Sequence, residues 1–372
     1  MKVWKSFDIL PSLHPKAALA WASLNLLTKR RYDALLAQFG TLEEAWKKLD
    51  ANMLMQLGCK PDTVSRTLEL ASTFNADTFA ASLREKNIQF LSIEDKEYPE
   101  RLREIHDPPI FLFNQGNSDL LQEPSIALVG TRAMSSYGKR VTELFTQGMV
   151  RAGLVTVSGL AIGIDAEVAR QTIAAGGKHI AVLGNGIDAI FPPVNASLAE
   201  EILAKGGLLL SEFPPGVPPG KFTFPARNRI IAGLSMGTIV LEASSDSGSL
   251  ITADLALDYA REVFAVPGQV FDQNFSGTHE LIVKGCAHLA RTPEDVLAAC
   301  GVITPESPAR SHYQPASEEE EKVIAALTTM PQAKDDITLR VNLPVASVNA
   351  TLTLLELKGV AKNVGGGHWV KT

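Results

Sequence analysis

The feature that most constrains the fold is an alternation of short apolar runs with helix-length amphipathic stretches, from about Asn87 to Leu297. Strands that alternate with helices form βαβ units and a mostly parallel sheet. Gly or Ser ends or follows each run from the third onward, at the carboxyl edge where open α/β sheets bind ligands. The predicted strands are NIQFLSI, IFLFN, SIALVG, LVTVSG, HIAVLG, LLLSEF, GTIVLEA and EVFAVPG.

The segment before this core predicts a small helical domain, residues 1–82. It is rich in Leu, Ala, Lys and Glu, and its apolar residues recur three and four apart. Gly40, followed by Thr41 and Glu44, predicts the end of one helix and the Thr-capped start of the next. The short helices resemble helix-hairpin-helix or SAM-like modules.

The segment after the core predicts a linker and a winged helix. Residues 300–316 are rich in Pro and Ser, become acidic and show no periodicity, as linkers do. Residues 317–372 contain three short helical patterns followed by the glycine-tipped hairpin AKNVGGGHWVK. The sequence therefore predicts an α/β core over residues 83–299, with a helical domain before it and a winged helix after the linker.

Composition limits the classes of function. The 372-residue chain has a formal net charge of -6, so any nucleic-acid binding must be local. Cys59, Cys286 and Cys300 form no CxxC pair, which indicates a reducing compartment and no structural zinc. No apolar run reaches the length of a membrane span, and Asp8 and two prolines interrupt the start of the chain. We expect a cytoplasmic protein with no membrane segment, metal or cofactor.

Three strand-to-helix junctions predict anion sites. Gly130, Thr131 and Arg132 combine helix amides, a hydroxyl and a guanidinium, although a plain turn with a surface Arg explains them equally well. Glycines after the next strand allow close backbone approach, and Asp165 beyond them is interpreted as a helix cap. At the third junction a serine can cap the helix while other amides remain for an anion. The second and third junctions hold Ser158, Gly159, Gly163, Ser247, Gly248 and Ser249.

The segment from Gly216 to Ile231 predicts a single-strand binding groove. It carries Lys221, Arg227 and Arg229 with no acidic residue, and two phenylalanines are interleaved with them. Cations that follow phosphates and aromatic faces on which bases stack are the components of such a groove. The alternative is that the phenylalanines anchor a long loop and the cations are merely solvated. We expect a non-strand turn here.

The motifs GTR, SGLAIGID, GNGID, SEFPPG, KFTFPARNRII, EASSDSGSLITA and VPG resemble, in order and spacing, the DNA-processing protein A (DprA/Smf) family. The resemblance covers the core and extends to both terminal domains. It implies a Rossmann-like core without enzymatic activity. It also implies binding and protection of incoming single-stranded DNA during natural transformation, help in loading the RecA recombinase, and a homodimer formed through the core.

The resemblance also implies residue roles. The family's Gly-Ser/Thr-Arg element, which contacts the DNA backbone, matches Gly130 to Arg132. Its DNA-contacting lysine and phenylalanine match Lys221 and Phe224. Phe224 is therefore expected to stack on a base and Phe222 to anchor the loop. The family's RNR-type run adds Arg227 and Asn228.

Two other functions fit the same pattern. The core is also similar to that of phosphoribohydrolases that cleave nucleoside monophosphates, and Glu242 or Asp246 would then act in the reaction. The PGGxGTxxE stretch of those enzymes is missing, and neither a GxSxG nucleophile elbow nor a metal-spaced cluster is present. In the third interpretation the winged helix binds a protein or duplex DNA, and the core only dimerises.

Overall fold

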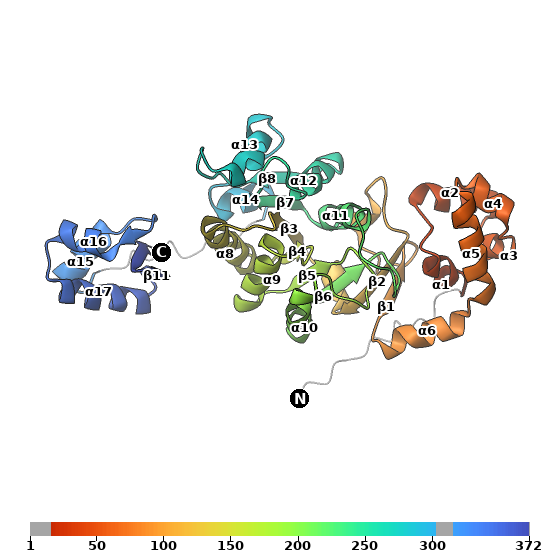
Figure 1. Cartoon of the computed structure of the whole chain (residues 1–372), viewed down its shortest axis with the longest axis horizontal. Coiled ribbons are helices and arrows are strands. Elements are labelled where there is room, and N and C mark those ends of the chain that lie inside the picture. Colours follow the sequence, from red (N-terminus) through yellow and green to blue (C-terminus); the bar gives the residue numbers. More distant parts are fainter. Residues whose placement is uncertain (1–15, 303–314, 372) are drawn as a thin grey trace. The chain divides into compact units, whose positions relative to one another are not determined.

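The computed structural model describes residues 16–302 and 315–371. The chain divides into two compact units, Met1–Ile303 and Thr304–Thr372. The first contains the predicted helical domain and the α/β core, and the second contains the winged helix (Figure 1). Most of the predicted linker, residues 303–314, lies outside the described residues.

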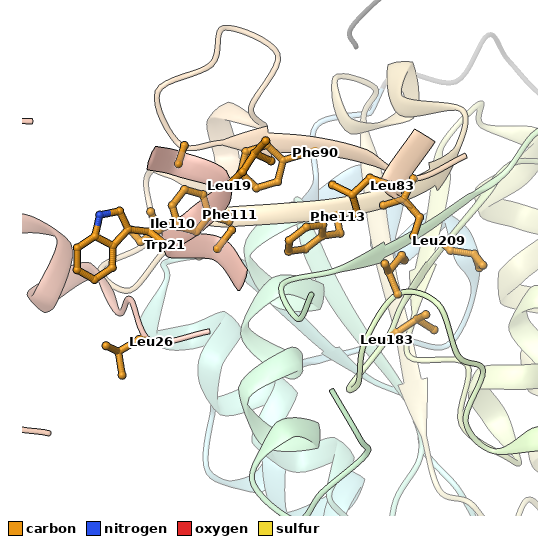
Figure 2. Close-up of a cluster of buried hydrophobic side chains, with 14 of the residues drawn as sticks. Leu19, Trp21, Leu26, Leu83, Phe90, Ile110, Phe111, Phe113, Leu183 and Leu209 are labelled. Carbon is orange, nitrogen blue, oxygen red and sulfur yellow. The ribbon is translucent and has the colours of Figure 1, made fainter. Parts of the chain in front are cut away.

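Helices occupy residues 16–85, in the segment for which the sequence predicts a helical domain, and they share a hydrophobic core with the sheet. Gly40 ends one helix at φ +79°, and the Thr41 side chain accepts a hydrogen bond from the Glu44 amide, as expected. Figure 2 shows Leu19 and Trp21 of this domain in the same cluster as Phe90 of the sheet. The helices are α1 Lys16–Ser23, α2 Lys29–Phe39, α3 Leu42–Lys47, α4 Ala51–Gln56, α5 Pro61–Thr73 and α6 Ala76–Glu85.

The core is a nine-stranded sheet in the order β1-β2-β6-β5-β4-β3-β7-β8-β9. Pairing is antiparallel for β1 with β2 and for β2 with β6, and parallel elsewhere. This confirms the predicted Rossmann-like, mostly parallel core. All eight predicted strands form, and in this sheet the sequence missed the two-residue β9. The strands are β1 Gln89–Ser92, β2 Phe111–Gly116, β3 Ser125–Gly130, β4 Val155–Ser158, β5 His179–Val182, β6 Leu208–Ser211, β7 Gly237–Glu242, β8 Glu262–Ala265 and β9 His288–Leu289.

Helices cover both faces of the sheet because alternate strand residues point to opposite sides. In β3, Ile126 and Leu128 pack under α8 and α9, whereas Ala127 and Val129 pack under α11 and α12. The helices of the core are α7 Glu100–Arg103, α8 Ser136–Arg151, α9 Ile164–Ala174, α10 Ala196–Ala204, α11 Thr223–Leu234, α12 Ser249–Asp258, α13 Ser276–Val283 and α14 Pro293–Ala299. Short 3-10 helices span Ser118–Leu121, Pro193–Asn195 and Gln273–Phe275.

The second unit is a winged helix, as predicted. Three helices enclose a core that includes Val323, Ile337, Leu352 and Trp369, and a small sheet in the order β10-β12-β11 completes it. The elements are α15 Glu318–Ala326, β10 Gln332–Ala333, α16 Lys334–Val341, α17 Val345–Leu357, β11 Ala361–Gly365 and β12 His368–Lys371.

Candidate functional site

A pocket of about 520 Å³ opens at the carboxyl edge of β3 and β7, where an open α/β sheet is expected to bind ligands. It collects residues from three separate predicted motifs, because all three follow strands that end at this edge. The predicted site residues that line it are Gly130, Thr131, Arg132, Lys221, Phe224, Arg227, Asn228, Ser247, Gly248 and Ser249.

The turn after β3 presents Arg132 to this pocket. The Thr131 amide donates to the Glu242 carbonyl at 2.7 Å, and the Thr131 carbonyl accepts from the Ile164 amide at 3.1 Å. A Cβ on Gly130 would lie 2.8 Å from that same Glu242 carbonyl oxygen, so only glycine lets the backbones meet here. Arg132 is exposed, and its guanidinium lies 5.8 Å from the ring centre of Phe224.

The loop after β4 lies beneath the pocket. Ser158 is fully buried and donates its hydroxyl to the Asp165 carbonyl, and a Cβ on Gly159 would lie 2.1 Å from the Arg227 guanidinium. Gly163, at φ +81°, packs against the Thr131 carbonyl. None of the three lines the pocket. The expectation that Ser158 and Gly159 contact DNA is therefore corrected: burial leaves them no exposed group, and they shape the site from below.

Arg227 forms the floor of the pocket. It is 5% exposed, and its guanidinium donates to the carbonyls of Gly159 and Val182 and to the Asn228 side chain. The expected role in direct DNA contact stays a prediction: Arg227 lines the pocket, while its Nε and Nη1 donors bond inside the protein. Burial lowers the pKa of Arg227, and the negative charge of Asp165 opposes that shift.

Asp165 belongs to the same floor, and the sequence analysis gave it only a capping role. Its carboxylate accepts from the Gly159 amide at 3.0 Å, so it fixes the preceding loop. Burial raises the pKa of Asp165, and the nearby Arg227 guanidinium opposes that shift. An Asp in a first helical turn is the only signal in the sequence, and it does not distinguish the two roles. Ser244 and Asp246, after β7, also line the pocket; Ser244 was not predicted, and Asp246 was named only for the enzyme alternative.

The expectation that Phe222 anchors the loop is wrong, whereas the stacking role expected of Phe224, which lines the pocket, stays a prediction. The predicted non-strand turn ends where α11 begins at Thr223. Phe222 is 86% exposed, so it cannot anchor the loop. The half-buried Phe224 does so, since its ring packs against Gly184 and lies 5.7 Å from the ring of Phe191. Lys221 is exposed and forms no ion pair or side-chain hydrogen bond in the part of the chain that the structure describes.

The serines before α12 bring hydroxyls to the pocket wall. The Ser247 and Ser249 hydroxyls lie 2.8 Å apart. Gly248 occupies the N-cap position without a side-chain bond, and the Ser249 amide reaches the Ser247 hydroxyl only at 3.4 Å. The serine cap expected for this helix is therefore weak.

The candidate catalytic carboxylates lie in different environments. Glu242 is fully buried and accepts from the Ser135 amide at 3.1 Å, so it is engaged with α8 and does not line the pocket. Burial raises the pKa of Glu242. Asp246 lines the pocket, where its carboxylate accepts from the Ser244 hydroxyl at 2.6 Å.

The described residues contain neither a group of metal ligands nor a membrane-spanning helix. Among residues 16–302 and 315–371, no three His, Cys, Asp or Glu side chains are grouped so that they could hold a metal ion. No helix within those ranges has the length and apolar character needed to cross a membrane. The three cysteines are free thiols.

Comparisons with known proteins identify similar chains. The model of the family described as DNA recombination-mediator protein A matches residues 89–301, and the DprA winged helix domain matches residues 306–367. The chain is 34% identical to Protein Smf of Synechocystis, over 94% of this chain and 96% of that protein. It is 36% identical to Protein Smf of Escherichia coli, over 86% and 87% of the two chains.

Two solved structures are also similar. The X-ray structure of DNA processing protein A from Streptococcus pneumoniae superposes with a TM-score of 0.64 at 39% identity, covering 77% of this chain and 98% of that one. DNA processing protein A from Helicobacter pylori, described for its single-stranded DNA binding mode, superposes with a TM-score of 0.51 at 32% identity, covering 57% and 95%.

Proposed function

The chain belongs to the DNA recombination-mediator protein A family, also called DprA or Smf, and on that premise we propose that it binds single-stranded DNA at the pocket, without chemistry. One observation carries the proposal. Arg132 and Lys221 come from distant parts of the chain, line one pocket, and form no ion pair within the described residues. Two unpaired cations on an acidic protein suit a phosphate backbone.

The geometry suggests a division of roles. Arg132 and Lys221 contact phosphates, and the hydroxyls of Ser247 and Ser249 add neutral donors on the opposite wall. Phe222 offers a free ring next to Lys221, whereas Phe224 holds Arg132 over its own face. Phosphate contacts carry no base information, so sequence preference is small. Stacking requires an unpaired base, which favours a single strand over a duplex.

The cellular role follows from the family. We propose protection of single-stranded DNA during natural transformation and help in loading the RecA recombinase. Free thiols at all three cysteines support the cytoplasm as the compartment. We also propose a homodimer through the core. The edge strand β9 supports it, because an exposed edge can pair with another chain. Leu289 in β9 is 46% exposed, and Val283 at the end of α13 is 86% exposed.

A nucleotide-cleaving enzyme is the less favoured alternative. The buried Glu242 is engaged with α8, which leaves Asp246 as the exposed carboxylate that could act in the pocket. Asp246→Asn tests this: a phosphoribohydrolase turnover of a nucleoside monophosphate that this change abolishes would support the enzyme.

The decisive test is fluorescence anisotropy with single- and double-stranded oligonucleotides, comparing the wild-type protein with Arg132→Ala and Lys221→Ala. We expect each change to weaken single-strand binding about tenfold or more, since each removes a charge-assisted phosphate contact. The slope of log K against log salt should fall by about 0.7 for each lost contact on a single strand.

Lys205→Ala is the matched control, because Lys205 is exposed at the opposite edge of the sheet, just before β6. Its affinity and salt slope should equal those of the wild type. Binding that none of the three changes affects would remove the pocket from the proposal.

A further inference from the structure

The loop between β8 and α13 exposes two large apolar side chains that the site described above does not use. Phe271 is 96% exposed and Val270 is 82% exposed. Single exposed apolar residues are common on protein surfaces. An adjacent pair at a loop tip, one of them an almost completely exposed aromatic ring, is a reason to examine how the loop is held and what lies beside it.

The backbone of this loop is fixed at several points. The Tyr137 hydroxyl donates to the Pro267 carbonyl at 3.0 Å, and the Gly268 amide donates to Nε2 of His279 at 3.2 Å. A Cβ on Gly268 would lie 2.0 Å from the Phe275 ring, so the packing leaves no space there. The loop is therefore built to hold its shape while Phe271 points into solvent.

The loop borders the proposed DNA pocket. β8 pairs with β7 in parallel, so the loops that follow both strands lie at the same edge of the sheet. The Ser245 amide, in the loop that lines the pocket, donates to the Ser276 hydroxyl at 3.0 Å. On the other side, Tyr137 connects the loop to α8, which begins four residues after Arg132.

The cation on this side of the pocket is Arg132, which is exposed and lies four residues before the start of α8. Lys139, in the first turn of α8, is two residues from Tyr137 and so lies on another flank of the helix. The Asp272 carboxylate beside Phe271 already accepts from the Asn274 amide at 3.0 Å. An arginine for a phosphate and a free ring for a base are the two components of a single-strand contact.

We propose that Phe271 is a second base-stacking residue, which receives the strand where it leaves the pocket past Arg132 and the start of α8. This inference rests on the proposed function, because it extends that same binding site. Its occupant is a stretch of single-stranded DNA long enough to reach from the pocket to the loop. A second copy of this chain is the competing occupant.

The experiment measures anisotropy at one salt concentration with strands of about 6 and about 20 nucleotides, since site sizes on such proteins run from about 4 to 16 nucleotides. Phe271→Ala should weaken the long strand about tenfold and leave the short one unchanged. Phe271→Trp, which keeps a stacking face, should bind the long strand as the wild type does.

Two controls make the test specific. Leu339→Ala removes an 80% exposed apolar side chain in the winged helix and should change neither strand. On a long strand whose bases have been removed, the wild type and Phe271→Ala should bind equally, because only stacking distinguishes them.

The outcomes separate the two proposals. If the wild type binds neither strand, the proposed function fails, and this inference fails with it. If Arg132→Ala weakens both strands while Phe271→Ala matches the wild type on the long one, the pocket stands and the inference is overturned. It is also overturned if Phe271→Ala turns a dimer into a monomer in sedimentation and Phe271→Trp does not restore binding.

Discussion

The floor and the rim of the pocket each carry an arginine, and the two arginines lie in opposite environments. The floor consists of Gly159, Asp165 and Arg227, all buried, with Gly159 hydrogen-bonded to both side chains. The rim consists of Arg132 and Lys221, both exposed, and the exposed Phe222 follows Lys221 in the chain. Arg227 and Arg132 look alike in the sequence, yet Arg227 is buried and bonded to backbone carbonyls, whereas Arg132 is exposed. Burial, and not residue type, therefore separates the groups that shape the site from those that bind.

The largest expected effect is on the free energy of unfolding, which a change in the floor should lower far more than a change in the rim. Arg227→Leu leaves the Gly159 and Val182 carbonyls unpaired and Asp165 as an isolated buried charge. Removing one partner from a buried charged pair costs about 3 to 5 kcal/mol in the free energy of unfolding. Urea unfolding measures it.

Arg132→Leu is the matched rim control and should change that free energy by less than about 0.5 kcal/mol. Equal destabilisation by both changes would mean that floor and rim do not differ as described.

The second expected effect is a dependence of the free energy of unfolding on pH, caused by the buried His179 next to Ser158. The buried His179 ring lies 2.8 Å from the Thr156 hydroxyl and 3.3 Å from that of Ser158, and burial lowers its pKa to about 3. The unfolded chain binds the proton more tightly, so the full stability is present above about pH 6.5 and is lost as the pH falls toward 3. From pH 7 to pH 5 this histidine should remove about 2 kcal/mol.

The measurement is urea unfolding at both pH values for the wild type and His179→Asn. All other titrating groups are common to the two proteins, so the variant should lose about 2 kcal/mol less than the wild type. Parallel losses in both would contradict the assignment to His179.

The smallest expected effect tests the two phenylalanines. Phe222→Ala should weaken single-strand binding about fivefold, near the lower end of the range for base stacking, without changing stability. Phe224→Ala should lower the free energy of unfolding by roughly 1 to 2 kcal/mol, because its ring is half-buried against Gly184 and Phe191. Paired anisotropy and urea measurements test both. If Phe224→Ala alone reduced affinity and left stability intact, the stacking role would return to Phe224.

Much of the fold follows from local sequence. The run SIALVG predicts β3 because its apolar residues can be buried on both faces, and Gly40 with Thr41 marks a helix boundary. The two-residue β9 was missed because so short a run has no periodicity to read. The winged helix followed from three helical patterns and a glycine-tipped hairpin.

The site was predicted less completely. Arg132 and Lys221 were correctly placed at one pocket, because both follow strands that end at the same edge of the sheet. Arg227 was predicted to contact DNA, and residue type and spacing do not reveal that its side chain is buried. Phe222 was expected to anchor the loop for the same reason, since the start of α11 at Thr223 decides the directions of Phe222 and Phe224.

By itself, the sequence determined the order of strands and helices, the winged helix and the family, because these depend on local patterns and on motifs that can be read along the chain. Only the tertiary structure decided which of those motifs face solvent. That depends on how β4, α9 and α11 pack against one another, and on the hydrogen bonds that Arg227 and Asp165 form across long separations in the sequence. A donor that is hydrogen-bonded inside the protein is not available to a ligand, whatever the residue type.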